Sequence, residues 1–325
     1  MKILAVDDDL IILELLREFF AVIGEHELIT SDSPEEALMI ASTTPDIQCF
    51  LLDIQMPGMD GIELCQALRK MPRFKRTPVL MLTAMSEKRY IDNAFAAGAT
   101  DYVTKPFELS ELQGRIQLVA SLVQERRSGS ERAAVSYPGR NRVRRIVPQL
   151  TLDQPFEIND VKGVIEAHAL ENYLQKLTRS AMFGSTIFAF AIRDVEKLFH
   201  SIKPYDFRGV ISDVAEALSD CLVGNQFLMA YLGNGLFGCV TEDGWMPDLD
   251  DFVSRTQIEI LKMGLYSSDG TPLDVEVVHG KALRLDWRSS SSVLTAFEDI
   301  VDSARHAALC ASAQRQSRWP LRATA

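Results

Sequence analysis

Five side chains with acidic, hydroxyl or amine groups follow the apolar segments in the N-terminal third of the chain. They are Asp7 and Asp8 after residues 2–6, Asp53 at the end of residues 47–53, Thr83 after residues 78–82 and Lys105 shortly after residues 100–103. Segments that are apolar at nearly every position predict strands buried on both faces, as in a parallel sheet covered by helices. Because open α/β sheets place their ligand sites at the carboxyl ends of the strands, these five side chains are expected to converge.

The expected cluster has the groups that phosphoryl transfer requires. Three neighbouring carboxylates repel one another unless a divalent cation neutralises them, and hard oxygen ligands suit Mg²⁺. The hydroxyl of Thr83 and the ammonium of Lys105 would add a hydrogen-bond donor and a cation for a phosphoryl group. Taken singly, Asp53 could simply begin a turn. The shared position of all five residues at strand ends favours phosphoryl chemistry.

The elements that must position these residues can be read from the same region. Apolar residues at spacings of three and four predict helices between the strands, with Asp9 suited to the first N-cap and Pro34 to a first helical position. The helices are expected over residues 10–20, from 34, over 60–70, over 87–97 and from 108, and a further strand over 27–30. Five strands alternating with five helices predict an α/β domain with a doubly wound, five-stranded parallel sheet.

Residues 1–122 resemble the receiver domain of two-component response regulators, a flavodoxin-like fold. The motifs that carry the resemblance are Val6-Asp7-Asp8, Asp53 with residues 56–61, Thr83-Ala84, Gly98-Ala99 and Lys105-Pro106. It implies that Asp53 is phosphorylated by a sensor histidine kinase or a phosphotransfer protein of a phosphorelay.

The resemblance also implies roles for the neighbouring residues. Asp8, Asp53 and the carbonyl of Gln55 would bind Mg²⁺ directly, and Asp7 would reach it through water. Thr83 and Lys105 would contact the phosphoryl group, and Tyr102 would be an aromatic switch residue. The Lys105–Pro106 bond would be cis, which only X-Pro bonds adopt at low cost.

Composition and charge divide the 325 residues into two acidic domains with a basic linker. Residues 1–122 carry 11 Lys and Arg against 19 Asp and Glu, and residues 123–150 carry 7 against 2. No apolar run approaches a membrane span, no secretory signal is evident, and the five cysteines are scattered, so a cytoplasmic protein without a membrane partner is expected. Acidic domains also disfavour nucleic-acid binding.

The linker combines a helical and an irregular part. Apolar residues at 109, 112, 116, 119 and 123 predict that the last receiver helix continues past the domain and ends near residues 128–130. Residues 131–149 are rich in Arg and contain Pro and Gly without periodicity, which indicates a flexible connector.

Residues 151–325 predict a second α/β domain that contains an antiparallel hairpin. An Asn-Gly turn at residues 233–235 joins two apolar segments, the usual signal for a hairpin. Strands are expected over residues 186–192, 227–232, 236–240 and 273–278, and helices over 164–178, 207–222, 252–262 and 293–311.

The order of these elements resembles a GGDEF (diguanylate cyclase) domain without its chemistry. The segment that lies where the family has its Gly-Gly-Asp-Glu-Phe turn consists of Gly233, Asn234, Gly235, Leu236 and Phe237. The turn acids are therefore missing, and the acid expected after the first strand is at best Asp194, displaced by about one residue. Two-metal phosphoryl chemistry needs carboxylates to hold the ions, so a degenerate, non-catalytic domain is expected.

Together these patterns predict a response regulator that signals through protein–protein interaction and forms a homodimer on phosphorylation. The downstream protein cannot be named from the sequence. Two alternatives stay open for the second domain: an active cyclase with relocated ligands, and a nucleotide-binding module without activity. A transcription factor is less favoured, because no helix-turn-helix spacing or basic face is evident.

Overall fold

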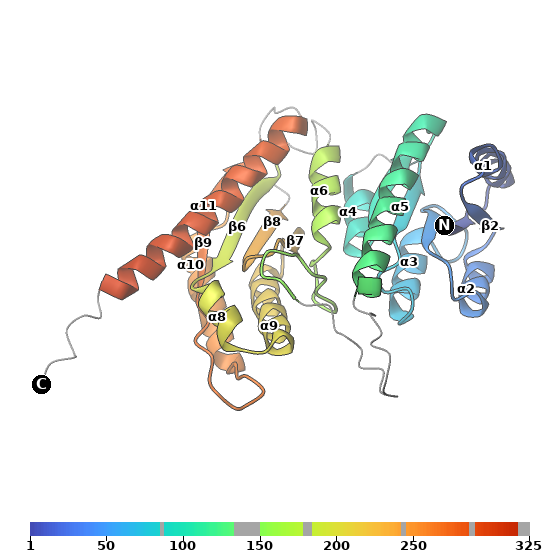
Figure 1. Cartoon of the computed structure of the whole chain (residues 1–325). Helices are drawn as coiled ribbons and strands as arrows, with labels where there is room; N and C mark the ends of the chain where they lie inside the picture. Colours follow the sequence, from blue (N-terminus) through green and yellow to red (C-terminus); the bar gives the residue numbers. More distant parts are fainter. Residues whose placement is uncertain (85–87, 133–149, 178–183, 242–244, 286–289, 318–325) are drawn as a thin grey trace, which may run out of the picture. The chain divides into compact units, whose positions relative to one another are not determined.

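The chain divides into two compact units, unit 1 over residues 1–149 and unit 2 over residues 150–325, which are described separately. This computed structural model describes residues 1–84, 88–132, 150–177, 184–241, 245–285 and 290–317 (Figure 1). The expected flexible connector at 133–149 lies outside the described residues. None of the described helices has the length and apolar character needed to cross a bilayer.

Unit 1 is a parallel sheet of five strands in the order β2-β1-β3-β4-β5, which confirms the predicted flavodoxin-like fold. The strands are β1 (Lys2–Val6), β2 (Glu27–Ser31), β3 (Cys49–Asp53), β4 (Val79–Thr83) and β5 (Asp101–Thr104). The helices are α1 (Leu10–Ile23), α2 (Pro34–Thr43), α3 (Gly61–Lys70), α4 (Lys88–Ala96) and α5 (Leu109–Arg132). The three central strands β1, β3 and β4 are nearly or wholly buried because helices cover both faces.

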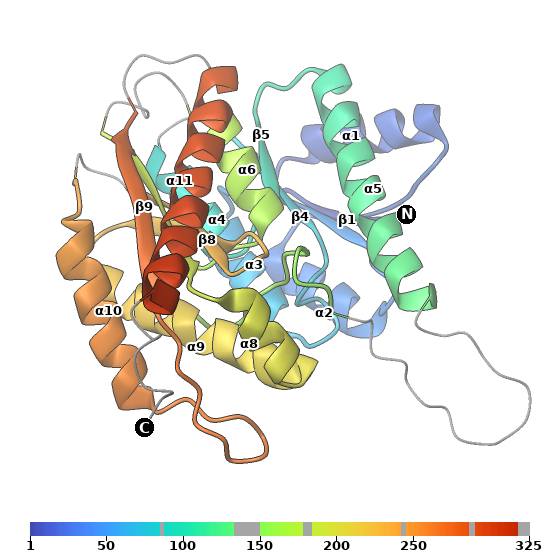
Figure 2. The ribbon, with the colours of Figure 1, turned by 60° about the vertical axis from the view of Figure 1, so that its left-hand side comes forward.

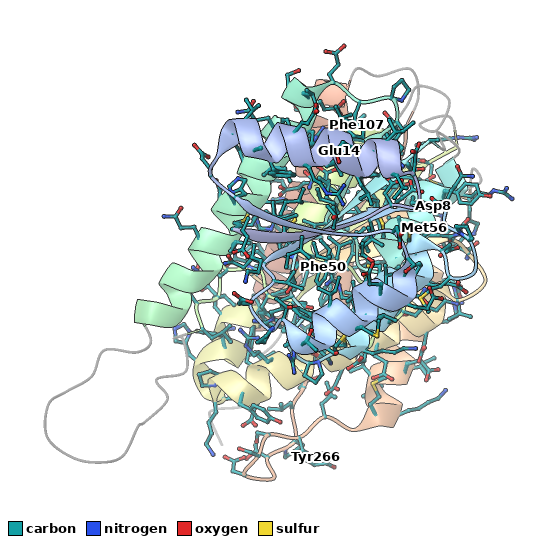
Figure 3. All side chains as sticks on the ribbon, turned by 90° about the vertical axis from the view of Figure 1, so that its right-hand side faces the viewer. Asp8, Glu14, Phe50, Met56, Phe107 and Tyr266 are labelled. Atoms are coloured by element: carbon teal, nitrogen blue, oxygen red, sulfur yellow. The ribbon has the colours of Figure 1, made fainter. Side chains whose placement is uncertain are left out.

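Helices α1 and α5 share one face of this sheet, and α1 and α2 lie on opposite sides of it (Figure 3). Leu13 and Leu16 of α1 and Leu112 and Ile116 of α5 pack on the strands from that side. The starts of the helices follow the sequence signals. Asp9 caps α1 by accepting a hydrogen bond from the Ile11 amide, as predicted.

Helix α5 differs from its predicted end. It runs on to Arg132, so the expectation that residues 128–130 terminate it was wrong. A single Gly costs a helix only about 1 kcal/mol relative to Ala, and the neighbouring Gln, Glu and Arg residues are good helix formers. The start near Glu108 agrees with the prediction.

Unit 2 has an antiparallel sheet of four strands in the order β7-β8-β6-β9. The strands are β6 (Thr186–Ile192), β7 (Phe227–Tyr231), β8 (Leu236–Thr241) and β9 (Val277–Arg284). The helices are α6 (Ala167–Lys176), α8 (Val195–Ser201), α9 (Pro204–Leu222), α10 (Leu249–Met263) and α11 (Ser290–Ser317), with α11 lying along the sheet (Figure 2). The predicted β7–β8 hairpin is present, and the chain order gives the ferredoxin-like β-α-β-β-α-β arrangement.

Several predicted boundaries in unit 2 were wrong. The last strand is Val277–Arg284 rather than residues 273–278, because the preceding residues close a loop in which the Leu273 amide bonds to the Leu265 carbonyl. Helix α6 begins at Ala167 rather than at Val164, which forms a parallel bridge to Met229 of β7. Helix α8 was not anticipated.

Candidate functional site

The carboxyl ends of β1 and β3 bring three carboxylates together. Oxygen atoms of Asp7, Asp8 and Asp53 all lie within 4.8 Å of one another. Asp7 is fully buried and Asp53 is 4% exposed, whereas Asp8 faces solvent. Figure 3 shows Asp8 beside Met56 at this end of the sheet, away from Phe50 in the middle of β3. The convergence predicted from the sequence is therefore present in the structure.

Lys105 bridges the two buried carboxylates. Its Nζ atom lies 2.6 Å from Oδ2 of Asp7 and 2.8 Å from Oδ1 of Asp53, and its side chain is 15% exposed. Such short, largely desolvated ion pairs stabilise the charged forms of their members. The ammonium offsets part of the repulsion among the carboxylates.

The pKa values at the site reflect a balance between burial and this ion pair. Burial raises the pKa of both Asp7 and Asp53, and the hydrogen bond from Lys105 opposes that rise only in part. Burial alone would lower the pKa of Lys105, but the bonds to Asp53 and Asp7 outweigh it and the pKa is raised. Two carboxylates that are costly to keep charged favour the approach of another cation.

The backbone fixes the positions of these groups. The Asp7 amide bonds to the Ser31 carbonyl, and the Lys105 amide bonds to the Thr83 carbonyl at 2.6 Å. The peptide bond between Lys105 and Pro106 is cis, as the resemblance to receiver domains implied. Ser31 had no role in the sequence interpretation, although a serine ending a strand next to β1 could have indicated one.

Thr83 and Tyr102 occupy different environments. Thr83 is fully buried at the end of β4, where it pairs in register with Thr104. Leu82, the residue before it, is the register partner of Asp53, so Thr83 lies one step beyond that aspartate on the neighbouring strand. The Tyr102 ring points instead toward α4, packs edge-on against Phe95 at 6.2 Å, and has its pKa raised to about 12 mainly by burial.

The donor set fits a divalent cation. Asp7, Asp8 and Asp53 supply only oxygen atoms, which Mg²⁺ prefers, and the exposed Asp8 leaves one side of the cluster open to water. Gln55, the remaining predicted ligand, is exposed two residues after Asp53. No described group of three or more His, Cys, Asp or Glu elsewhere in the chain has comparable spacing.

Gly61 controls how closely α3 approaches the site. Its amide bonds to the Ile54 carbonyl at 3.0 Å, and a Cβ atom at this position would overlap the carbonyl oxygen of Asp53. Asp60 caps the helix through a full capping box with Glu63. The glycine therefore lets α3 begin directly against the backbone of Asp53, a function that the sequence motif alone did not explain.

In unit 2 the segment that resembles a GGDEF turn is closed off by the chain itself. Gly233, Asn234 and Gly235 have φ values of 82°, 52° and 71°, three consecutive left-handed residues. The Asn234 amide bonds to the Leu152 carbonyl at 2.6 Å. A Cβ on Gly235 would lie 2.7 Å from Cγ2 of Val195.

Asp194, the acid that the sequence offered as the nearest match to a metal ligand after β6, is already neutralised by its neighbours. Its carboxylate lies 2.7 Å from Nζ of Lys197 and 3.7 Å from the guanidinium of Arg193. The hydrogen bond from Lys197 is the main reason why the pKa of Asp194 is lowered. Leu236 and Phe237, which the resemblance assigned to the same turn, are buried apolar members of β8.

The comparison with known proteins concerns unit 1. The family described as "Response regulator receiver domain" matches residues 3–117. The heme response regulator HssR of Staphylococcus haemolyticus is 42% identical over 120 residues, which are 37% of this chain and 51% of that protein. The response regulator MprA of Mycobacterium leprae is 39% identical over 117 residues, 36% of this chain and 50% of that protein.

Among solved structures, the chemotaxis response regulator CheY4 of Vibrio cholerae is 33% identical and is similar to 36% of this chain and 97% of its own, with a TM-score of 0.35. The chain spans about half the length of the curated relatives that it matches. Residues 3–117 are thus a response regulator receiver domain, and the family match ends before unit 2 begins.

Gly61→Ala is expected to destabilise unit 1 and slow its phosphorylation, because the added methyl group must displace α3 or the carbonyl of Asp53. Overpacking of this kind typically costs about 1–3 kcal/mol. Urea unfolding measures the stability. The control is Gly114→Ala in α5, where a Cβ meets nothing within 4 Å, and a gain of about 0.5–1 kcal/mol is expected. Equal stability of the Gly61→Ala variant and the wild type would refute the steric account.

Proposed function

We propose that the chain is a phosphorelay response regulator in which Asp53 accepts a phosphoryl group from a histidine kinase or phosphotransfer protein. In this proposal the second domain is a degenerate GGDEF-like module that signals through protein–protein interaction rather than catalysis. The observation that carries the proposal is the buried ion pair of Lys105 with Asp7 and Asp53, within a receiver domain.

In the reaction, an oxygen of the Asp53 carboxylate attacks the phosphorus of a phosphohistidine, and the bond from phosphorus to the imidazole nitrogen breaks. Lys105 then exchanges its contact with the carboxylate for one with the new phosphoryl oxygens. A Mg²⁺ ion held by Asp7, Asp8, Asp53 and the Gln55 carbonyl would neutralise the charge that develops on those oxygens. The phosphoryl group carries about 1.5–2 negative charges in place of the single charge of the Asp53 carboxylate, at a site that one ammonium already serves.

The surface beside the site supports a protein as the phosphoryl donor. Helix α1 begins directly after Asp8 and Asp9, and Ile11 in its first turn is 77% exposed. Leu10 and Leu15 are exposed on the same helix. Apolar side chains at the mouth of an acidic site suit docking of another protein better than capture of a small phosphate donor alone.

Asp53 is expected to be the single phosphorylation site. With acetyl phosphate and Mg²⁺, intact mass should show one added phosphate on the wild type and none on Asp53→Asn. Asp8→Ala should also remain unlabelled, because it removes a metal ligand. Asp46→Asn, an exposed aspartate paired with Lys2, is the matched control and should be labelled like the wild type. Labelling that persists in Asp53→Asn would show that the acceptor is another residue.

The topology of unit 2 supports the GGDEF-like assignment. The turn of the β7–β8 hairpin lies at the C-terminal end of β6, because Leu236 pairs with Ala191 and the Ile192 amide bonds to the Gly235 carbonyl. An enzyme would need free carboxylates at this edge. The only nearby candidate from the sequence, Asp194, is held by Lys197, so the proposal includes no cyclase activity.

One observation favours the alternative of a silent ligand-binding module. A cavity of about 340 Å³ lies beside the β6–α8 connection, between α8 and the loop before β9. Its lining includes Arg193, Asp194, Lys197 and Asp269. Calorimetry with GTP and with cyclic di-GMP separates the two candidates, because only the alternative requires saturable heat of binding.

No cyclic di-GMP is expected from GTP with the purified chain in either phosphorylation state. The double variant Gly235→Asp, Leu236→Glu should also be inactive and less stable than the wild type. Position 235 has φ +71° and its Cβ would press on Val195, while position 236 is buried. Product analysis after incubation with GTP and Mg²⁺ is the measurement, with an active diguanylate cyclase as positive control. Turnover by the wild type would overturn the non-catalytic assignment.

Dimerisation on phosphorylation is proposed through the face formed by α4, β5 and α5. The charged residues that the sequence places on this face are Lys88, Arg89, Asp92, Asp101, Glu108, Glu111 and Arg115. Asp92 and Asp101 are, however, only 4% and 3% exposed, and Asp101 is already paired with Arg115 at 3.0 Å. Among the side chains of this face that the structure describes, the exposed charges are those of Arg89, Glu108 and Glu111, while the side chain of Lys88 lies outside the described residues. Exposed pairs contribute about 0–1 kcal/mol each, so the effect should be modest.

Light scattering should show a larger mass with beryllofluoride than without it, and the difference should shrink at high salt because exposed ion pairs are screened. Glu111→Lys should reduce the beryllofluoride-dependent gain, whereas Glu18→Lys on α1 should not. An unchanged mass under all these conditions would mean that the receiver acts within a monomer or within a constitutive dimer, and the proposed dimerisation would be abandoned.

A further inference from the structure

The cavity beside the β6–α8 connection has a partly apolar lining. It measures about 340 Å³ and lies between one face of α8 and residues 267–274 of the loop before β9. Leu198, Ile202 and Leu273 line it and are only partly buried against the core of unit 2. Helix α8 has no fully buried residue, so part of its apolar surface is left to the cavity. A space of this size and lining suits an occupant that brings an apolar group of its own.

The charged side chains of the cavity favour a cationic occupant. The lining carries three carboxylates against two cations, and both cations, Arg193 and Lys197, already pair with acids. Asp269 instead accepts hydrogen bonds from the Ser267 hydroxyl and from the Thr271 amide, which lower its pKa to about 2. Neither of these donors is charged, so the loop side of the cavity keeps a negative charge. A positive group on the occupant would complement it.

Helix α11 leads the chain toward this cavity (Figure 2). Ser312, five residues before the helix ends, lies beside the carboxylate of Asp194, whose pKa its hydroxyl helps to lower. The last five residues of α11 add about 7.5 Å, because each helical residue rises about 1.5 Å. An extended residue spans about 3.3–3.6 Å, so two residues after Ser317 are enough to return by the same distance. The chain that follows α11 therefore starts within reach of the cavity.

The sequence after α11 has the composition that this lining favours. Residues 318–325 lie outside the described residues and read Arg-Trp-Pro-Leu-Arg-Ala-Thr-Ala, with two cations and no acid. The residue before a proline prefers extended backbone, so Pro320 disfavours a helix that continues past Trp319. An indole and a leucine thus stand between two arginines, which combines apolar groups with positive charge in one short segment.

We propose that residues 318–322 dock in the cavity of the same chain. The indole of Trp319 packs against Leu198 on α8, and the guanidinium of Arg322 pairs with Asp269. Because α11 tethers the segment beside the cavity, its effective concentration there is high and few contacts are needed. The docked segment blocks access of small ligands to this edge of unit 2. The contact goes beyond the proposed function, because it involves neither the receiver nor the degenerate turn.

Emission from Trp319 tests the docking in the full chain. The difference between the spectra of the wild type and of Trp319→Phe isolates this indole from the other two tryptophans. We expect it to emit at shorter wavelength than a free peptide of residues 318–325 and to be less quenched by acrylamide. Ser201→Arg adds bulk and a cation at an exposed position of the lining and should return the emission to that of the peptide. Arg322→Glu should weaken the shielding because it places two acids together at Asp269, whereas Arg322→Lys should retain most of it.

Ser254→Arg is the matched control for Ser201→Arg. Both serines are exposed on helices, and the hydroxyl of each bonds at 2.8 Å to a carbonyl of the preceding turn. Ser254 lies on α10 and does not line the cavity. The emission of Trp319 in this variant should therefore match the wild type, and circular dichroism checks that both variants are folded.

A disulfide test locates the segment independently. In a Cys310→Ser background, which removes the exposed native thiol, Thr271→Cys with Ala323→Cys should form a disulfide within one chain under mild oxidation, whereas Ser254→Cys with Ala323→Cys should not. Emission equal to that of the free peptide, or shielding that Ser201→Arg leaves intact, would overturn the proposal and leave the cavity to a ligand. Shielding that rises with protein concentration would place the segment in a second copy and reject the intramolecular contact.

Discussion

Repulsion among buried carboxylates is the constraint on which the site in unit 1 depends. Asp7 and Asp53 are withdrawn from water at the ends of adjacent strands, and burial raises the pKa of both. The ammonium of Lys105 is the counter-charge that the described chain supplies to these two residues, and it must serve both. The site carries more negative than positive charge. An added cation or a rearrangement of the lysine therefore reduces the repulsion that remains among the carboxylates.

This constraint explains the demands on the surrounding backbone. Parallel register places Asp53 beside Leu82 and Thr83 beside Thr104, so a small movement of one strand end changes the distance to its neighbour. The absence of a side chain at Gly61 allows α3 to begin against the carbonyl of Asp53. The geometry of the cluster therefore depends on backbone contacts that substitution of the charged residues alone would not reveal.

The sequence predicts unit 1 well because its three central strands are almost uniformly apolar and each functional residue ends a strand or directly follows one. Asp7, Asp8, Asp53 and Lys105 converge as expected. The surface charges were predicted less well, since Asp92 and Asp101 are buried although nothing in their local pattern distinguishes them from exposed acids. In unit 2 the boundaries of β9 and α6 were misplaced because a bridge from Val164 to β7 and a closed loop before β9 depend on contacts distant in sequence. The spacing of apolar residues predicts which face of a helix or strand is buried, but not which distant segment packs against that face.

The carboxylates at the ends of β3 and β6 differ in how their cationic partners are arranged. At Asp53 the partner of the carboxylate is an ammonium shared with Asp7, so a new anion on Asp53 changes how that ammonium is divided. At Asp194 the carboxylate has Lys197 at 2.7 Å and Arg193 at 3.7 Å, although Arg193 also pairs with Glu276. The amide of Asn234 in the neighbouring turn bonds to the Leu152 carbonyl. A carboxylate with two cations close by gains little from a further ligand. A carboxylate that shares one ammonium with a second carboxylate responds whenever that ammonium moves toward either of them. The ammonium shared by Asp7 and Asp53 is therefore the feature on which the chemistry proposed for unit 1 depends.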